Sequence, residues 1–142
     1  MKPFREKLDA AVTRSGSLLC IGLDPDIDRF PSHLAEKDPY HAILEFNRQI
    51  VESTSDLVCA YKPNLGFYVA CGIPGLQALA DTRALIPDGI PAILDCKVGD
   101  FNVTSAGYAH GFFDLWDFDA ITISANRAIP HLPFRLGFLE TR

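Results

Sequence analysis

Asp95 and Lys97 lie two positions apart at the end of an apolar run, and Asp100 follows soon after. In a β-strand, residues i and i+2 project from the same face, about 6.6 Å apart along the strand. Charges at a buried strand end are costly unless they are paired. A lone Asp-x-Lys pair is therefore either a structural bridge or a carboxylate and an ammonium group held beside a bound ligand.

Two other apolar runs also end in a charged side chain, at Asp24 and at Lys62. Both are followed by a proline that ends the run, as happens where a strand passes into a loop. Ligands of parallel α/β proteins bind at the carboxyl ends of the strands. Three charged strand ends in succession, with Asp95 and Asp100 beside the third, favour a functional site over separate structural bridges.

The elements that position these residues alternate along the chain. Helical periodicity predicts helices over 3–15, 40–55 and 73–85, and one more beginning near Asn102 or Thr104. Continuous apolar runs predict buried strands over 18–23, 57–61, 90–94 and 119–124. Strands that alternate with helices are typical of a parallel sheet with right-handed crossovers. The predicted fold class is therefore α/β with about four parallel strands.

Composition limits the other possibilities. The 142 residues are enough for one compact domain, and a net charge of −5 gives no electrostatic reason to expect nucleic acid as a partner. No apolar stretch approaches the roughly 18 residues of a membrane span, and no secretory signal is evident, so we expect a cytoplasmic protein.

The cysteines at 20, 59, 71 and 96 form no C-x-x-C pair, and we interpret them as small buried apolar residues. The four histidines lack metal-ligand spacing, so no metal site is predicted.

Three short motifs give the chain a family resemblance. They are Gly22-Leu23-Asp24-Pro25-Asp26, Tyr61-Lys62-Pro63-Asn64 and Asp95-x-Lys97-x-x-Asp100-x-x-x-Thr104-Ser105. In this order and spacing they resemble the successive signatures of the orotidine 5′-phosphate decarboxylases. The resemblance implies a phosphate-binding (β/α)8 barrel that converts orotidine 5′-monophosphate to UMP and CO2, in pyrimidine biosynthesis, without a cofactor or metal.

The resemblance also implies roles for individual residues. Lys62, Asp95, Lys97 and Asp100 match the alternating Lys–Asp–Lys–Asp array of the family, with Lys97 as electrostatic stabiliser and proton donor. Asp24 matches the residue that hydrogen-bonds the ribose. Thr104 matches a substrate-contacting position which, like Asp100, reaches across the interface of a homodimer in that family.

The length of the chain leads to a further expectation. A β/α barrel needs about 250 residues and eight strands, so residues 1–126 are interpreted as the first half of a barrel and 127–142 as a divergent tail. Two other hypotheses stay open. The chain could be a metal-dependent sugar-phosphate lyase of the same barrel superfamily, or an inactive fragment that serves as an assembly module.

Overall fold

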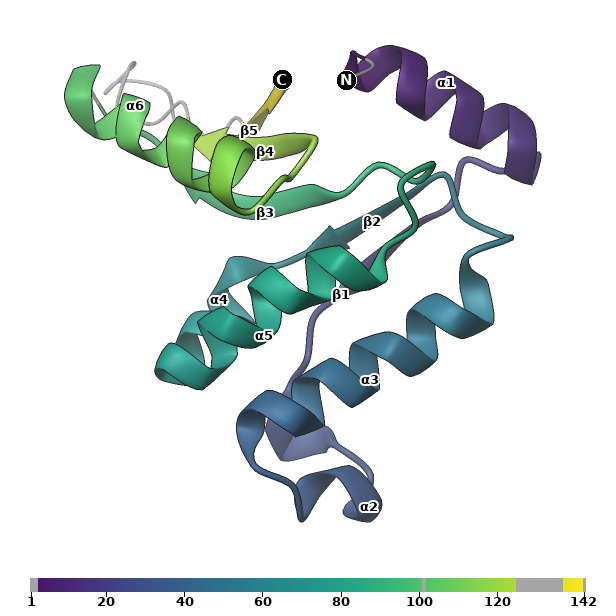
Figure 1. Cartoon of the computed structure of the whole chain (residues 1–142), viewed down its shortest axis with the longest axis vertical. Coiled ribbons are helices and arrows are strands. Elements are labelled where there is room, and N and C mark those ends of the chain that lie inside the picture. The colour runs from purple at the N-terminus through teal and green to yellow at the C-terminus, as the bar shows by residue number, and fades with distance from the viewer. Residues whose placement is uncertain (1–2, 101, 125–136, 142) are drawn as a thin grey trace.

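The structure is a computed structural model that describes residues 3–100, 102–124 and 137–141 (Figure 1). The strands are β1 (Cys20–Leu23), β2 (Ala60–Pro63), β3 (Ile93–Val98), β4 (Ala120–Ser124) and β5 (Gly137–Thr141). The α-helices are α1 (Phe4–Ser15), α2 (Ser32–Ala35), α3 (Pro39–Thr54), α4 (Leu65–Ala70), α5 (Gly72–Leu85) and α6 (Asn102–Ala109). A 3-10 helix, η1 (Ile27–Arg29), follows β1, and a π-helix, η2 (His110–Leu115), continues α6.

The prediction of four parallel strands is confirmed. β1 pairs in parallel with β2, and β3 pairs in parallel with β4. Two isolated parallel bridges, Tyr61 to Ala92 and Asn64 to Asp95, join β2 to β3. The spatial order of the parallel strands is therefore β1-β2-β3-β4. The sequence did not predict β5, which lies in the segment interpreted as a divergent tail and pairs with β4 in the antiparallel direction.

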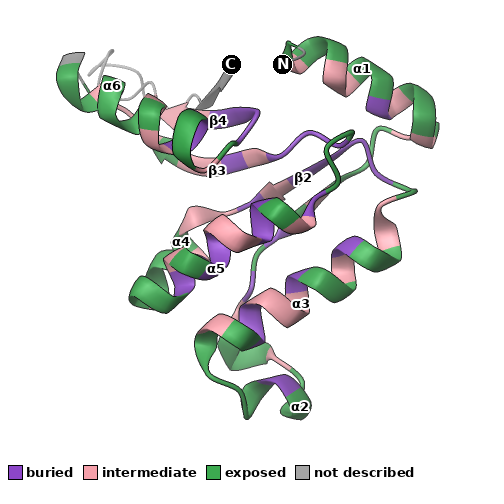
Figure 2. Cartoon of the chain, viewed as in Figure 1, coloured by how far each residue is buried: buried purple, intermediate pink, exposed green. Residues whose placement is uncertain are grey.

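The main hydrophobic core lies between one face of the sheet and the helices that follow the strands. Figure 1 shows α3 and α5 together on one side of β1 and β2. Figure 2 shows buried residues along the strands and along the sides of those helices that face them. The cluster includes one or more buried residues from each parallel strand and from these two helices: Leu23, Tyr61, Leu94, Ile121, Ile43, Val51, Ala78 and Leu79.

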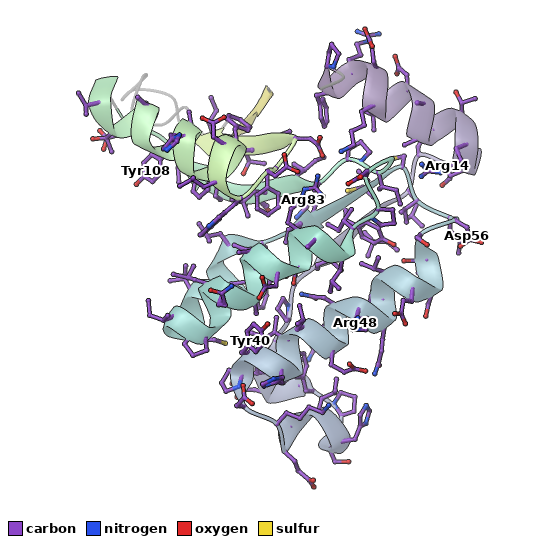
Figure 3. All side chains as sticks on the ribbon, in the orientation of Figure 1. Arg14, Tyr40, Arg48, Asp56, Arg83 and Tyr108 are labelled. Atoms are coloured by element: carbon purple, nitrogen blue, oxygen red, sulfur yellow. The ribbon has the colours of Figure 1, made fainter. Side chains whose placement is uncertain are left out.

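Helix α1 packs against the amino-terminal end of β2. Ala11 of this helix is buried in a second, smaller cluster with Cys59 and Ala60. Gly16 ends the helix in the left-handed conformation, with φ of 61°, which a residue without a Cβ adopts at little cost. Arg14 (Figure 3) donates hydrogen bonds to the carbonyl oxygens of Gly89 and Val58, and so ties α1 to the segments before β3 and β2.

Two expectations about burial were wrong. The segment 18–23 is not buried on both faces. Leu18 and Leu19, which precede β1, are 83% and 48% exposed, and within β1 only Leu23 is buried. Of the four cysteines only Cys59 is buried. Cys20 is exposed on the edge strand, and Cys71 and Cys96 are partly buried.

Two helix starts differ from the prediction as well. The sequence did not predict α4, which follows β2. This short helix forms because Asn64 Oδ1 accepts a hydrogen bond from the Gly66 amide at 3.0 Å and caps its first turn. Asn102 is the first residue of α6 and Thr104 lies inside it, so neither stands before the helix as its cap. Residue 101 and the segment 125–136 lie outside the described residues.

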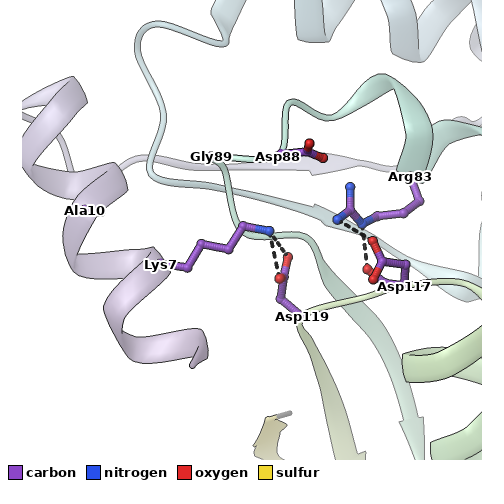
Figure 4. Close-up of a pocket in the computed structure, with 7 residues that line it drawn as sticks. All are labelled: Lys7, Ala10, Arg83, Asp88, Gly89, Asp117 and Asp119. Carbon is purple, nitrogen blue, oxygen red and sulfur yellow. Dashed lines mark hydrogen bonds and ion pairs between the residues drawn. The ribbon is translucent and has the colours of Figure 1, made fainter. Parts of the chain in front are cut away.

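A nearly buried ion pair joins α1 to the amino-terminal end of β4 (Figure 4). Lys7 Nζ lies 2.7 and 2.8 Å from the two carboxylate oxygens of Asp119, and the side chains are 12% and 8% exposed. Asp119 Oδ2 also accepts a hydrogen bond from the Ala92 amide at 2.8 Å. Beside this pair, Arg83 donates to the Asp117 carboxylate at 2.9 Å. Both pairs line a cavity of about 370 Å³ at the amino-terminal ends of the strands.

The Lys7–Asp119 pair generates a prediction about stability. Replacing Lys7 with Met leaves a carboxylate buried without its cation, so we expect the free energy of unfolding to fall by about 3 kcal/mol. Urea unfolding followed by circular dichroism measures this change. Arg5→Met is the matched control on the same helix, because Arg5 and Asp9 are 90% and 70% exposed and such pairs contribute little. Equal losses in the two variants would contradict the role given to Lys7.

Candidate active site

Three of the charged side chains singled out in the sequence form one hydrogen-bonded group at the carboxyl ends of β2 and β3. Lys62 Nζ lies 3.1 Å from Asp95 Oδ2, and Lys97 Nζ lies 2.5 Å from Asp95 Oδ1. The Asp95 side chain is 11% exposed, whereas those of Lys62 and Lys97 are 33% and 59% exposed. One nearly buried carboxylate therefore holds two lysine side chains, both of which remain partly exposed.

The i, i+2 spacing predicted a regular strand between Asp95 and Lys97, but the backbone there is irregular. The register of β3 against β4 shifts between Leu94, opposite Ile121, and Val98, opposite Ile123. Three residues of β3 therefore lie opposite the single residue of β4 between those pairs. Lys97 itself has φ of +49°, a left-handed conformation that costs a non-glycine residue roughly 1–2 kcal/mol. The two side chains meet across this bulge and not along an extended strand.

Thr122 is a member of the group that sequence reasoning missed. Its hydroxyl donates a hydrogen bond to Asp95 Oδ1 at 2.8 Å and accepts one from the Lys97 amide at 3.0 Å. The available signal was a pair of polar residues, Thr122 and Ser124, at alternate positions of an otherwise apolar strand. That pattern marks one face of β4 as polar, but it does not say which side chain lies opposite.

Asp95 is held as a carboxylate by its neighbours. Burial acts to raise its pKa, but hydrogen bonds from Lys97, Thr122 and Lys62 outweigh that effect and lower the pKa from 3.8 to about 2. At neutral pH the group consists of one negative and two positive charges. Its net positive character suits an anionic ligand.

The other predicted site residues lie at the surface beyond the strand ends. Asp24 follows β1 directly and is exposed, and its carbonyl oxygen accepts a hydrogen bond from the Asp26 amide at 3.0 Å. Asp100 is exposed two residues after β3, and its carbonyl oxygen accepts a hydrogen bond from Ser105 Oγ at 2.5 Å. Thr104 is exposed on α6. These three residues border the strand ends, while Lys62, Asp95, Lys97 and Thr122 make the hydrogen-bonded centre.

A buried polar network supports the end of β1 where Asp24 begins. The Tyr68 hydroxyl donates a hydrogen bond to the carbonyl oxygen of Leu23 at 3.0 Å and accepts one from Asn47 Nδ2 at 2.9 Å. Asn47 also donates to Thr82 Oγ1 at 2.9 Å. Burial raises the pKa of Tyr68 far above its usual value, so the hydroxyl remains a neutral donor. The residue before Asp24 is therefore fixed by helices α3, α4 and α5.

The described residues give no indication of a metal centre. Within residues 3–100, 102–124 and 137–141, no three His, Cys, Asp or Glu side chains are grouped so that they could hold an ion. In the same part of the chain, no helix has the length and apolar character that a bilayer span requires.

Parallel strands, crossover helices and charged strand ends together define this chain as part of a β/α-barrel protein. A scan against models of protein families finds no match. Orotidine 5′-phosphate decarboxylases of Thermomicrobium roseum and Herpetosiphon aurantiacus are 55% and 51% identical to the chain over 120 and 121 residues. These matches cover 84% and 85% of the chain but 42% and 45% of those proteins. The chain therefore spans less than half the length of the curated relatives it matches.

Solved structures agree with the sequence matches. The OMP decarboxylase of Leishmania donovani superposes with a TM-score of 0.76 at 34% identity, over 89% of this chain and 46% of that one. The UMP synthase of the same organism superposes with a TM-score of 0.77 at 33% identity, over 89% of this chain and 26% of that one. The chain belongs to the orotidine 5′-phosphate decarboxylase family and represents a part of its barrel.

The low pKa of Asp95 predicts how stability depends on pH. A carboxyl group whose pKa is about 2 in the folded state and 3.8 in the unfolded state stabilises the fold above pH 4. This contribution, about 2 kcal/mol, is lost as the pH falls from about 4 to about 2. Urea unfolding of the wild-type chain and Asp95→Asn across pH 2–6 measures it. We expect a steeper fall for the wild type, and parallel profiles would show that Asp95 is not stabilised as the contacts indicate.

Proposed function

We propose that this chain supplies the catalytic charges of an orotidine 5′-phosphate decarboxylase, which converts orotidine 5′-monophosphate to UMP and CO2. The observation that supports this most directly is the Lys62–Asp95–Lys97 group at the carboxyl ends of neighbouring parallel strands. Family membership supplies the substrate class, since the matched relatives bear the name of that reaction. The reaction needs no cofactor in this proposal.

Lys97 has the central role in the proposed mechanism. Loss of CO2 from C6 of the pyrimidine leaves an electron pair in the plane of the ring, where the ring cannot delocalise it. A cation beside that carbon stabilises the developing charge, and it can then transfer a proton to the carbon. At 4 Å and an effective dielectric constant of 20, one such charge pair is worth about 4 kcal/mol. The 59% exposure of the Lys97 side chain leaves its ammonium group accessible to a substrate.

Asp95 and Lys62 complete the proposed charge array. Asp95 would lie against the departing carboxylate, where repulsion disfavours the ground state and disappears when neutral CO2 forms. Its low pKa keeps it ionised during this step. Lys62 would hold Asp95 in position from the neighbouring strand. We further propose that Asp24 binds the ribose, and that Asp100 and Thr104 contribute to the site across a homodimer interface.

The proposed activity depends on parts of the barrel that the matched relatives contain beyond the matched region. The phosphate of a barrel substrate is commonly bound by loops after strands seven and eight. Binding energy from such a remote group can lower the barrier at the reacting carbon. We therefore propose that turnover requires the remaining strands, supplied in cis or by another chain.

The free cysteines accord with a reducing, cytoplasmic location.

A complementation assay tests the function. The full chain is produced together with the carboxyl-terminal part of the Thermomicrobium roseum relative that lies beyond the matched region, and UMP formation from orotidine 5′-monophosphate is followed by chromatography. We expect UMP only when both parts are present. Turnover that a chelator abolishes would favour a metal-dependent lyase, and absence of turnover in a stably folded complex would favour an assembly role.

Lys97→Ala separates chemistry from folding. In the complemented enzyme we expect UMP formation to fall below detection, because the cation beside C6 is lost. The free energy of unfolding should change by less than about 1 kcal/mol, because the Lys97 side chain is largely exposed and Asp95 keeps Lys62 and Thr122 as partners. Lys37→Ala, at an exposed lysine distant in sequence from the motifs, is the control and should keep full turnover. Unchanged turnover in Lys97→Ala would remove the role proposed for this residue.

A further inference from the structure

Thr122 occupies the one position of β4 that faces the irregular part of β3. The ladder between the two strands is regular up to Leu94 and Ile121 and resumes at Val98 and Ile123. Thr122 is the only residue of β4 between these pairs, and it lies opposite the stretch that contains Asp95 and Lys97. Its main-chain carbonyl oxygen lies 3.4 Å from Cys96 Sγ, so the residue contacts all three members of that stretch.

The hydroxyl of Thr122 bonds both to the backbone and to a side chain of the bulge. Lys97 has a positive φ, and its amide donates to Thr122 Oγ1 at 3.0 Å. Such a conformation persists in a non-glycine residue only where the surroundings hold it in place. Because the hydroxyl accepts this bond with its oxygen, its proton is available for Asp95 Oδ1, which it reaches at 2.8 Å. One side chain thus fixes the carboxylate of Asp95 and the backbone of Lys97 together.

Among the described residues, the charged groups that face Asp95 are Lys62 from β2 and Lys97 from β3, and Thr122 is the neutral donor from β4. Lys97 has a long, largely exposed side chain that solvent could draw away from the carboxylate. Thr122 has a short, β-branched side chain with few rotamers, on a strand that is part of the sheet. It is therefore the more rigid of the two donors to Asp95 Oδ1.

We propose that Thr122 is a positioning residue, whose hydroxyl sets the orientation of the Asp95 carboxylate and the backbone geometry from which Lys97 reaches the reacting carbon. The kinetic part of this inference rests on the proposed function. The structural part, the effect of the Thr122 hydroxyl on Asp95 and on the backbone of Lys97, involves only residues of this chain. It can be tested in the chain by itself, even if the proposed function is wrong.

The first measurement is the titration of Asp95 by carbon-13 NMR in the full chain. In Thr122→Val, which keeps the shape but loses the hydroxyl, we expect the pKa of Asp95 to rise by about one unit, the worth of one hydrogen bond to a charged group. Thr122→Ser keeps the hydroxyl and should restore the wild-type pKa. Thr13→Val, which removes an exposed hydroxyl on α1, is the matched control and should leave Asp95 unchanged. If the valine variant does not fold, Thr122→Ala compared with Thr122→Ser gives the same test.

The second measurement is steady-state kinetics in the complemented enzyme. We expect Thr122→Val to lower kcat by roughly ten- to a hundredfold with little change in KM, because misplaced catalytic groups affect the chemical step. Thr122→Ser should recover most of the rate. A wild-type pKa of Asp95 in Thr122→Val would overturn the proposal, as would a raised KM with unchanged kcat. A complex that forms no UMP even with the wild-type chain would count against the proposed function, while the titration would still decide the role of Thr122.

Discussion

The nearly buried carboxylate of Asp95 is the constraint on which the arrangement of the strand ends depends. A charge in that position is tolerated only when it is paired and hydrogen-bonded, and here its partners come from three adjacent strands. Lys62 lies on β2, Lys97 on β3 and Thr122 on β4. The parallel register must bring all three ends to the same edge, and the apolar face behind them packs on α3 and α5 to keep that register.

The two ends of the sheet use charge in opposite ways. At the amino-terminal end, Lys7 and Asp119 are both nearly buried and saturate one another, which fastens α1 to β4. At the carboxyl-terminal end, Asp95 is nearly buried but Lys97 is mostly exposed. The nearly buried Lys7–Asp119 pair contributes to stability, whereas the exposed Lys97 side chain on the fixed Asp95 carboxylate remains available to a ligand. This division agrees with the general behaviour of β/α barrels, in which one face supports stability and the other carries the site.

Much of this arrangement could be predicted from the sequence because its signals are local. Continuous apolar runs predicted the four parallel strands, and the residues that end them predicted that Lys62 and Lys97 gather around Asp95. The rest depends on tertiary pairing. The bulge at Lys97 and the contact of Thr122 with Asp95 follow from the register of β3 on β4, which no local pattern in either strand encodes. The partial burial of β1 depends on its surroundings in the fold, and α4 was missed because the capping role of Asn64 was not recognised in the sequence.

The antiparallel strand β5 has a consequence for how this sheet can grow. All five of its residues pair with β4, from Gly137 opposite Ser124 to Thr141 opposite Ala120. A barrel that continues from β4 needs the same row of amide and carbonyl groups for its next parallel strand. Completion of the barrel on that side is therefore a strand exchange, in which the incoming segment competes with β5 and releases residues 137–141. The edge of β1 is different, since an added strand there meets no such competitor among the described residues.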